Sequence, residues 1–143
     1  MRARFIVPCL MAFILAFASV AQADQAGYLQ GYIYTLNGER QNVTRFFNVG
    51  FHDYVYVHDG VERRIPAREL QAVENRGLNK VMVTVRGQRP VRGTVKHNFQ
   101  GAPIQLLVGD LASPITFEFY DRTRGKIARG EVTAEEVKKI VFK

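Results

Sequence analysis

The feature that most constrains this fold is a hydrophobic period of two, which recurs along the chain from Tyr28 onward. In an extended strand, alternate side chains share a face, so this pattern sends one face to a core and the other to solvent. β-Branched and aromatic residues, which favour strands, are abundant here. The pattern predicts an all-β fold, a small antiparallel barrel or sandwich. The strand-like segments are Tyr28–Thr35, Val43–Val49, His52–Asp59, Lys80–Arg86, Pro90–His97, Ile104–Val108 and Ile115–Asp121.

Turn chemistry separates these segments. Asn37-Gly38 and Asp59-Gly60 are dipeptides that supply positive φ at both central positions of a type I′ turn, so each is predicted to join two antiparallel strands. Good helix formers occur in a row only at Ala67–Leu70 and Ala134–Val137, and each run is long enough for a single turn.

The N-terminus carries the pattern of a secretory signal peptide. Arg2 and Arg4 precede the apolar run Phe5–Val20, which closes on Ala21-Gln22-Ala23. An uncleaved membrane anchor is the alternative, but the run is shorter than the roughly 20 apolar residues of a spanning helix. We expect cleavage near Ala23, a periplasmic or secreted product, and no transmembrane segment in it.

The composition of the mature chain limits its chemistry. Cys9 is the only cysteine and lies within the signal sequence, which excludes disulfides, thiol catalysis and cysteine-ligated zinc from residues 24–143. This length suits one domain. Without Arg2 and Arg4 the chain has 18 basic and 13 acidic residues, a net charge of +5. A moderate excess of this kind favours anionic partners such as lipid headgroups, acidic glycans or other polyanions.

An internal similarity predicts two related halves packed as one domain. Ile65–Val73 matches Val132–Ile140 at an offset of 67 residues, and Gly38-Glu39-Arg40 resembles Gly87-Gln88-Arg89 at an offset of 49. Chance could produce matches this degenerate, but a duplication with repeats at residues 28–76 and 79–143 is the hypothesis that they favour.

Each repeat unit would comprise a strand, a hairpin, a strand, one helical turn and a closing strand. The ending Glu136–Phe142, preceded by Val91–Val95, resembles the close of the small SH3-like or Sm-like β-barrel modules of exported bacterial proteins. The resemblance implies a fold only, because small barrels host many unrelated activities. It brings no catalytic residues with it.

The residues best able to carry chemistry are His52, Asp53, His58 and Asp59. Six residues of extended strand place His52 and His58 roughly 20 Å apart, which is too far for them to share a metal ion. We therefore predict ordinary strand histidines, with no metal site, no cofactor and no catalytic constellation.

A tyrosine strip gives the first candidate binding surface. Tyr54 and Tyr56 alternate with the valines of the same strand and are flanked by His52 and His58. If this face is exposed, its rings could pair with a second strip on the first strand and form a platform for sugar rings or an extended peptide. The alternative is that these tyrosines belong to the core. The second strip consists of Tyr28, Tyr32 and Tyr34.

Two further surfaces are candidates. Arg122 and Arg124 belong to a basic cluster that could bind a polyanion, although a solvated basic surface is the simpler reading and nothing nearby indicates nucleic acid. The long connection Asn98–Ser113 contains Phe99, Leu106 and Leu107, which could dock a partner. An added hairpin packed on the core is the alternative there, because Ile104–Val108 is strand-like.

These observations favour a non-enzymatic binding module of the cell envelope. The first hypothesis is that it holds an envelope protein partner. The alternative is that it binds a glycan, a lipid headgroup or another polyanion. A small hydrolase without a recognisable motif ranks third.

Overall fold

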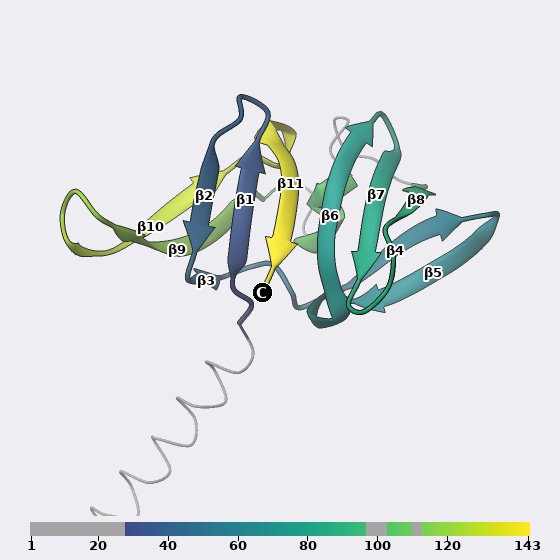
Figure 1. The fold of residues 1–143 in the computed structure, drawn as a ribbon, viewed down its shortest axis with the longest axis horizontal. Helices are drawn as coiled ribbons and strands as arrows, with labels where there is room; N and C mark the ends of the chain where they lie inside the picture. The colour runs from purple at the N-terminus through teal and green to yellow at the C-terminus, as the bar shows by residue number, and fades with distance from the viewer. Residues whose placement is uncertain (1–27, 97–102, 110–112) are drawn as a thin grey trace, which may run out of the picture.

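A computed structural model describes residues 28–96, 103–109 and 113–143. The prediction of an all-β fold with single-turn helices is confirmed, since antiparallel strands and three short 3₁₀ turns make up the described chain (Figure 1). The elements are β1 (Gly31–Thr35), β2 (Arg40–Val43), β3 (Arg45–Phe46), β4 (Asp53–His58), β5 (Val61–Pro66), η1 (Ala67–Glu69), β6 (Leu70–Gly77), β7 (Lys80–Val85), β8 (Val91–Thr94), η2 (Pro103–Leu107), β9 (Ile115–Asp121), β10 (Lys126–Val132), η3 (Ala134–Glu136) and β11 (Val137–Phe142).

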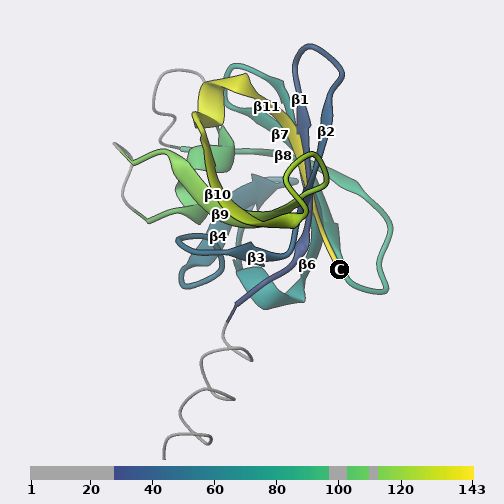
Figure 2. The same ribbon diagram turned by 90° about the vertical axis from the view of Figure 1, so that its left-hand side faces the viewer.

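The strands form two sheets. The larger has the order β2-β1-β11-β6-β7-β8-β4-β5, and the smaller has the order β10-β9-β3. The β9–β10 hairpin and the β4–β5 hairpin extend to opposite sides of the central strands (Figure 1). Seen from the side, β1, β2 and β11 form one layer, with β9 and β10 on one side of it (Figure 2). The other side of this layer faces solvent.

The two predicted hairpins are both present, but only one has the predicted turn. Asp59 and Gly60 both adopt positive φ, of 50° and 76°, and join β4 to β5 as expected of a type I′ turn. The β1–β2 connection is longer, and in it Gly38 alone has positive φ, of 88°. Here the type I′ prediction is wrong, because a longer loop closes with a single left-handed residue.

The two halves of the chain repeat the same order of elements. Each begins with a hairpin (β1–β2 or β7–β8) and ends with a hairpin, a 3₁₀ turn and a strand (β4-β5-η1-β6 or β9-β10-η3-β11). The central strands β6 and β11 pair with each other, and the pair Val73 and Ile140 lies at the middle of that ladder. These two residues are 67 positions apart, so a local two-fold axis passes between them.

The halves are interleaved rather than side by side. β1 pairs with β11 of the other half, and β7 pairs with β6 of the other half. Corresponding irregularities mark the two ladders: one register shift falls at Tyr34/Thr35 and the other at Leu70/Ala72. The Leu36 N–H donates to the Glu136 carbonyl at 2.9 Å, and the Arg86 N–H donates to the Glu69 carbonyl at the same distance. Each half therefore completes the sheet of the other.

The strand registers correct one detail of the sequence match. Gly31 pairs with Val43, and Val81 pairs with Gly93, so the first hairpins correspond at an offset of 50 residues rather than 49. Gly38 therefore corresponds to Gln88. The ending offset of 67 agrees with the pairing of β6 and β11.

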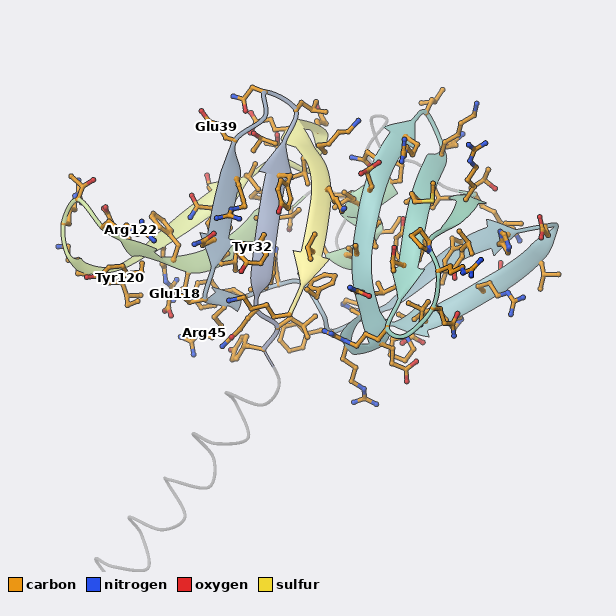
Figure 3. The ribbon with its side chains drawn as sticks, viewed as in Figure 1. Tyr32, Glu39, Arg45, Glu118, Tyr120 and Arg122 are labelled. Carbon is orange, nitrogen blue, oxygen red and sulfur yellow. The ribbon has the colours of Figure 1, made fainter. Side chains whose placement is uncertain are left out.

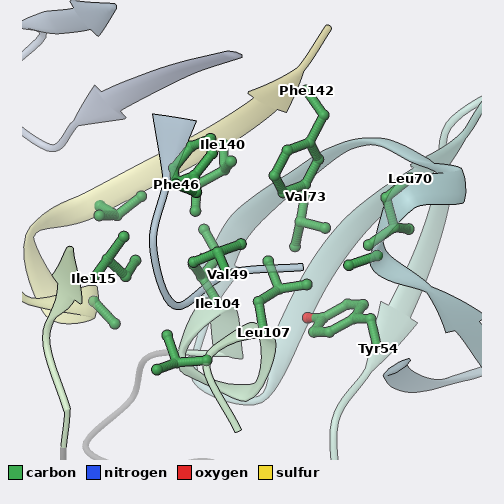
Figure 4. Packing of buried hydrophobic residues seen from close by; sticks show 14 of the residues in the cluster. Phe46, Val49, Tyr54, Leu70, Val73, Ile104, Leu107, Ile115, Ile140 and Phe142 are labelled. Carbon is green, nitrogen blue, oxygen red and sulfur yellow. The ribbon is translucent and has the colours of Figure 1, made fainter. Parts of the chain in front are cut away.

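The core lies between the two sheets and is closed by η2 (Figure 4). The sequence predicts a strand at Ile104–Val108, and this is wrong: Pro103–Leu107 is a 3₁₀ turn whose Ile104 and Leu107 side chains are fully buried. A 3₁₀ turn supplies its own hydrogen bonds, such as that from the Val108 N–H to the Gln105 carbonyl, so the segment fills the core without joining a sheet.

Candidate binding face

The tyrosine strip of β4 faces the core, so its prediction as an exposed binding surface is wrong. Tyr54 and Tyr56 are 0% and 4% exposed, and their rings stack at a centroid distance of 6.0 Å. The Tyr54 hydroxyl donates to the Pro103 carbonyl at 3.4 Å. Val55 and Val57, which the exposed-strip interpretation placed in the core, lie on the more accessible face. The alternative interpretation, core tyrosines, is the observed one.

Space on the neighbouring strand helps to decide which way β4 faces. A Cβ on Gly93 of β8 would lie 2.9 Å from the Tyr56 ring, so the missing side chain of Gly93 makes room for that ring. A tyrosine buries more apolar surface than a valine, which favours burial of the tyrosine face once such room exists.

Burial gives Tyr54 a testable effect on stability at alkaline pH. Desolvation, with a smaller contribution from Tyr56, raises the pKa of the Tyr54 hydroxyl above its ordinary value of 10.0. The unfolded state therefore loses this proton first, so the stabilisation is complete below pH 10 and is lost as the pH rises above it. We expect the free energy of unfolding to fall there by up to about 1.4 kcal/mol per pH unit.

Tyr54→Phe should remove that part of the slope, measured by urea unfolding at a series of pH values above 10. Tyr120→Phe is the matched control, because the Tyr120 side chain is 53% exposed. Equal slopes for the wild type and Tyr54→Phe would contradict the assignment.

The other predicted site residues are dispersed. His52 is exposed, whereas the His58 ring is half-buried, with Nδ1 2.7 Å from the Arg92 carbonyl and Nε2 3.3 Å from Asp59. Leu106 is half-buried against the core, and the burial of Leu107 makes its prediction as a docking side chain wrong. Phe99 lies outside the described residues. In the described chain, no three His, Cys, Asp or Glu residues are grouped so that they could hold a metal ion.

A different surface brings polar and aromatic side chains together. The solvent side of the six strands β2-β1-β11-β6-β7-β8, which we call the front face, carries two rows of directly opposed residues, because strand pairing continues across the layer. One row is Arg40, Tyr34, Lys139, Glu74, Met82 and Arg92; the other is Asn42, Tyr32, Val141, Ala72 and Thr84.

Tyr32 organises the positive charge at one side of the front face (Figure 3). The Arg40 guanidinium carbon and the Lys143 ammonium nitrogen each lie 5.1 Å from the centre of its ring. This is the range of a cation–π interaction. In the described part of the chain neither cation has an ion-pair partner. Tyr32, from the second predicted tyrosine strip, thus holds two cations at the surface.

A cleft of about 230 Å³ lies beside this cluster, between the β1–β2 strands and the β9–β10 hairpin. We call it the first cleft, and its polar lining includes Asn42, Tyr120, Arg122 and Lys143. Arg122 has no ion-pair partner within the described ranges. Arg124 does not line the cleft, and its guanidinium lies 3.7 Å from the Asp121 carboxylate. The predicted basic pair therefore separates into one cleft residue and one ion-paired neighbour.

A second cleft, of about 570 Å³, has three basic lining residues, Arg76, Lys80 and Arg92, and one acidic lining residue, Asp59. Arg76 pairs with Glu74, whereas no described carboxylate pairs with Lys80 or Arg92. By the offsets of 50 and 67, Lys80 corresponds to Gln30, Arg92 to Asn42 and Arg76 to Lys143, all of which line the first cleft. The two clefts therefore occupy equivalent places in the two halves.

The sequence hypothesis included Arg122 and Tyr32 but missed Lys80, Arg92 and Lys143. Strand alternation places each of these side chains on the outward face of its strand. Alternation alone does not show that they share a surface, because this also requires knowing which strands are neighbours.

Comparisons provide no relative from which a role could be transferred. No protein-family model, curated protein or solved structure matches the chain. A search of the described residues for a helix long and apolar enough to cross a membrane found none.

Proposed function

We propose that this chain is an exported binding module that holds an acidic polysaccharide on its front face. The observation that carries the proposal is the pair of clefts at equivalent places in the two halves, each with two basic side chains that lack a described ion-pair partner: Arg122 and Lys143 in the first, Lys80 and Arg92 in the second. A surface cation that forms no ion pair with a carboxylate of the protein is available to attract an anionic ligand.

The separation of the clefts favours a polymer over a small anion. Neighbouring strands are about 4.8 Å apart, so β2 and β8, five spacings from one another, are about 24 Å apart along the sheet. A small anion could occupy one cleft only. A chain with repeated carboxylates could reach both, and it would cross the half-exposed Tyr34 ring and the side chains of Val141 and Met82. Tyrosine offers an apolar ring face with a polar tip, which suits contact with sugars.

The place of action follows from the N-terminal pattern. The order of charged, apolar and small residues in Met1–Ala23 supports export and cleavage. Acidic glycans of the cell envelope are then accessible to the mature chain. The hypothesis of a protein partner held by Asn98–Ser113 has weaker support, because the described apolar side chains of that segment pack into or against the core.

Binding of alginate, a polymer of carboxylated sugars, tests the proposal. We expect Arg122→Ala to weaken binding about two- to fivefold, the range expected for one exposed ion pair. Arg124→Ala is the matched control, because Arg124 is two residues away and already pairs with Asp121. Isothermal titration calorimetry of the mature protein measures both, and affinity should fall as salt is raised.

Two outcomes would contradict the proposal. Equal weakening by both variants would indicate attraction by net charge without use of the cleft. Equal affinity for alginate and neutral dextran would exclude a role for the carboxylates.

A further inference from the structure

A third cleft, of about 700 Å³, is acidic although the chain as a whole is basic. It lies where the β1–β2 turn meets β10 and η3, and we call its charged lining the acidic corner: Glu39, Glu131, Glu135, Glu136 and Arg40. All five side chains are exposed, and none of the four glutamates has an ion-pair partner in the described residues. Four negative charges and one positive charge give the corner a net charge of −3.

The equivalent positions of the other half have the opposite charge. The offset of 67 relates Glu131 to Arg64 and Glu135 to Arg68, and the offset of 50 relates Glu39 to Arg89. Charge is thus reversed at three corresponding positions.

The remaining residues of the acidic corner, and its exposed Leu36, also have counterparts in the other half, and together these counterparts form a basic patch. Leu36 corresponds to Arg86, Glu136 corresponds to Glu69, and Arg40 corresponds to the uncharged Pro90. The Arg86 side chain is anchored by a hydrogen bond from Nε to the Arg68 carbonyl at 3.0 Å. The basic corner therefore consists of Arg64, Arg68, Arg86, Arg89 and Glu69, all exposed, with a net charge of +3.

The two corners lie at opposite ends of the molecule. In Figure 1 the β1–β2 turn is at the top of the front face, whereas the β7–β8 turn, which carries Arg86 and Arg89, is at the bottom. The local two-fold axis between Val73 and Ile140 exchanges these ends. The two corners, built from the same elements, therefore carry equal and opposite charges.

We propose that the chain associates head to tail with a second copy of itself, with the acidic corner of one copy against the basic corner of the next. The balance of −3 against +3 favours a second copy as the occupant, because both charged surfaces are present on every molecule. Such a contact uses two different surfaces, so each added copy leaves one corner of each sign free and the assembly can grow. Leu36, 64% exposed in the acidic corner, would also be covered by this contact.

The exposure of the charged side chains determines how strong the contact between two copies can be. Single exposed ion pairs are weak and are screened by salt, so the association should be weak, concentration-dependent and lost at high ionic strength. This inference is independent of the polysaccharide proposal, since none of the charged residues of the two corners lines either basic cleft.

Charge exchange between two variants tests the contact. In the first, Glu131→Arg and Glu135→Arg make both ends basic; in the second, Arg64→Glu and Arg68→Glu make both ends acidic. Sedimentation velocity at low salt should show association of the wild type that increases with concentration. Each variant alone should associate about tenfold or more weakly, because like charges now face each other. An equimolar mixture of the two variants should associate again, since opposite ends are then available.

The restored association in the mixture also shows that the variants are folded. A monomeric wild type at low salt and high concentration would overturn the proposal, as would variants that associate like the wild type. If the monomeric wild type instead bound polylysine and the first variant did not, the acidic corner would be a site for a cationic partner rather than for a second copy.

Discussion

Replacing Phe46 with alanine is expected to lower the free energy of unfolding by about 3–5 kcal/mol, the usual cost of truncating a fully buried phenylalanine. Phe46 is 0% exposed, and its ring meets that of Phe142 edge to face at a centroid distance of 5.6 Å. Phe46 belongs to β3 of the smaller sheet, and Phe142 belongs to β11 of the larger. The substitution therefore leaves a cavity where the two sheets are held together.

The neighbouring residue provides the control. Phe47 is half-buried at the surface, where its ring contacts Tyr28 and the Arg129 guanidinium. Phe47→Ala should cost less than half as much, because its site is open to water and leaves no closed cavity. Urea unfolding followed by circular dichroism measures both variants. Similar losses would mean that Phe46 does not occupy the junction between the sheets.

The sequence was sufficient to predict the class of fold and several local features. Asp59-Gly60 encodes its own hairpin, because positive φ at two adjacent positions is a local requirement. Ala67–Glu69 and Ala134–Glu136 form single turns, in agreement with two short runs of helix formers between strands. Local chemistry determines each of these features, so distant residues are not needed to predict them.

The orientation of β4 could not be predicted in this way. One face carries Tyr54 and Tyr56 and the other carries Val55 and Val57, so alternation alone leaves two apolar faces to choose between. The space for the Tyr56 ring comes from Gly93, a residue on another hairpin. Likewise, Ile104–Val108 reads equally well as a short strand and as a buried turn. Tertiary packing decides both cases.

The residues of the front face could not be grouped from the sequence for the same reason, because they lie far apart along the chain. Tyr34 of β1 lies opposite Lys139 of β11, which lies opposite Glu74 of β6. These pairings join segments from both ends and the middle of the chain. Arg122 was identifiable because several basic residues are adjacent there, whereas Lys80 and Arg92 acquire significance only through the cleft that they line.

Separating the two halves of the chain is expected to abolish folding of each. β1 pairs with β2 and β11, so a fragment of residues 24–78 leaves β1 with only its hairpin partner. β6 pairs with β11 and β7, and in the same fragment it loses both. An isolated two-stranded hairpin is at best marginally stable in water. Fragments 24–78 and 79–143 should therefore each lack a cooperative unfolding transition.

Mixing the two fragments in equal amounts should restore the fold, because the break falls in an exposed turn. Leu78 is 72% exposed, and the chain reverses there between β6 and β7, so a break costs few native contacts. Circular dichroism of each fragment and of the mixture distinguishes the possibilities. If either fragment folded alone, the halves would be independent small barrels, as the resemblance of their endings implies. Folding only in the mixture would show instead that each half depends on the other for its central strand. The β6–β11 ladder, in which Val73 pairs with Ile140, would then form only when both halves are present.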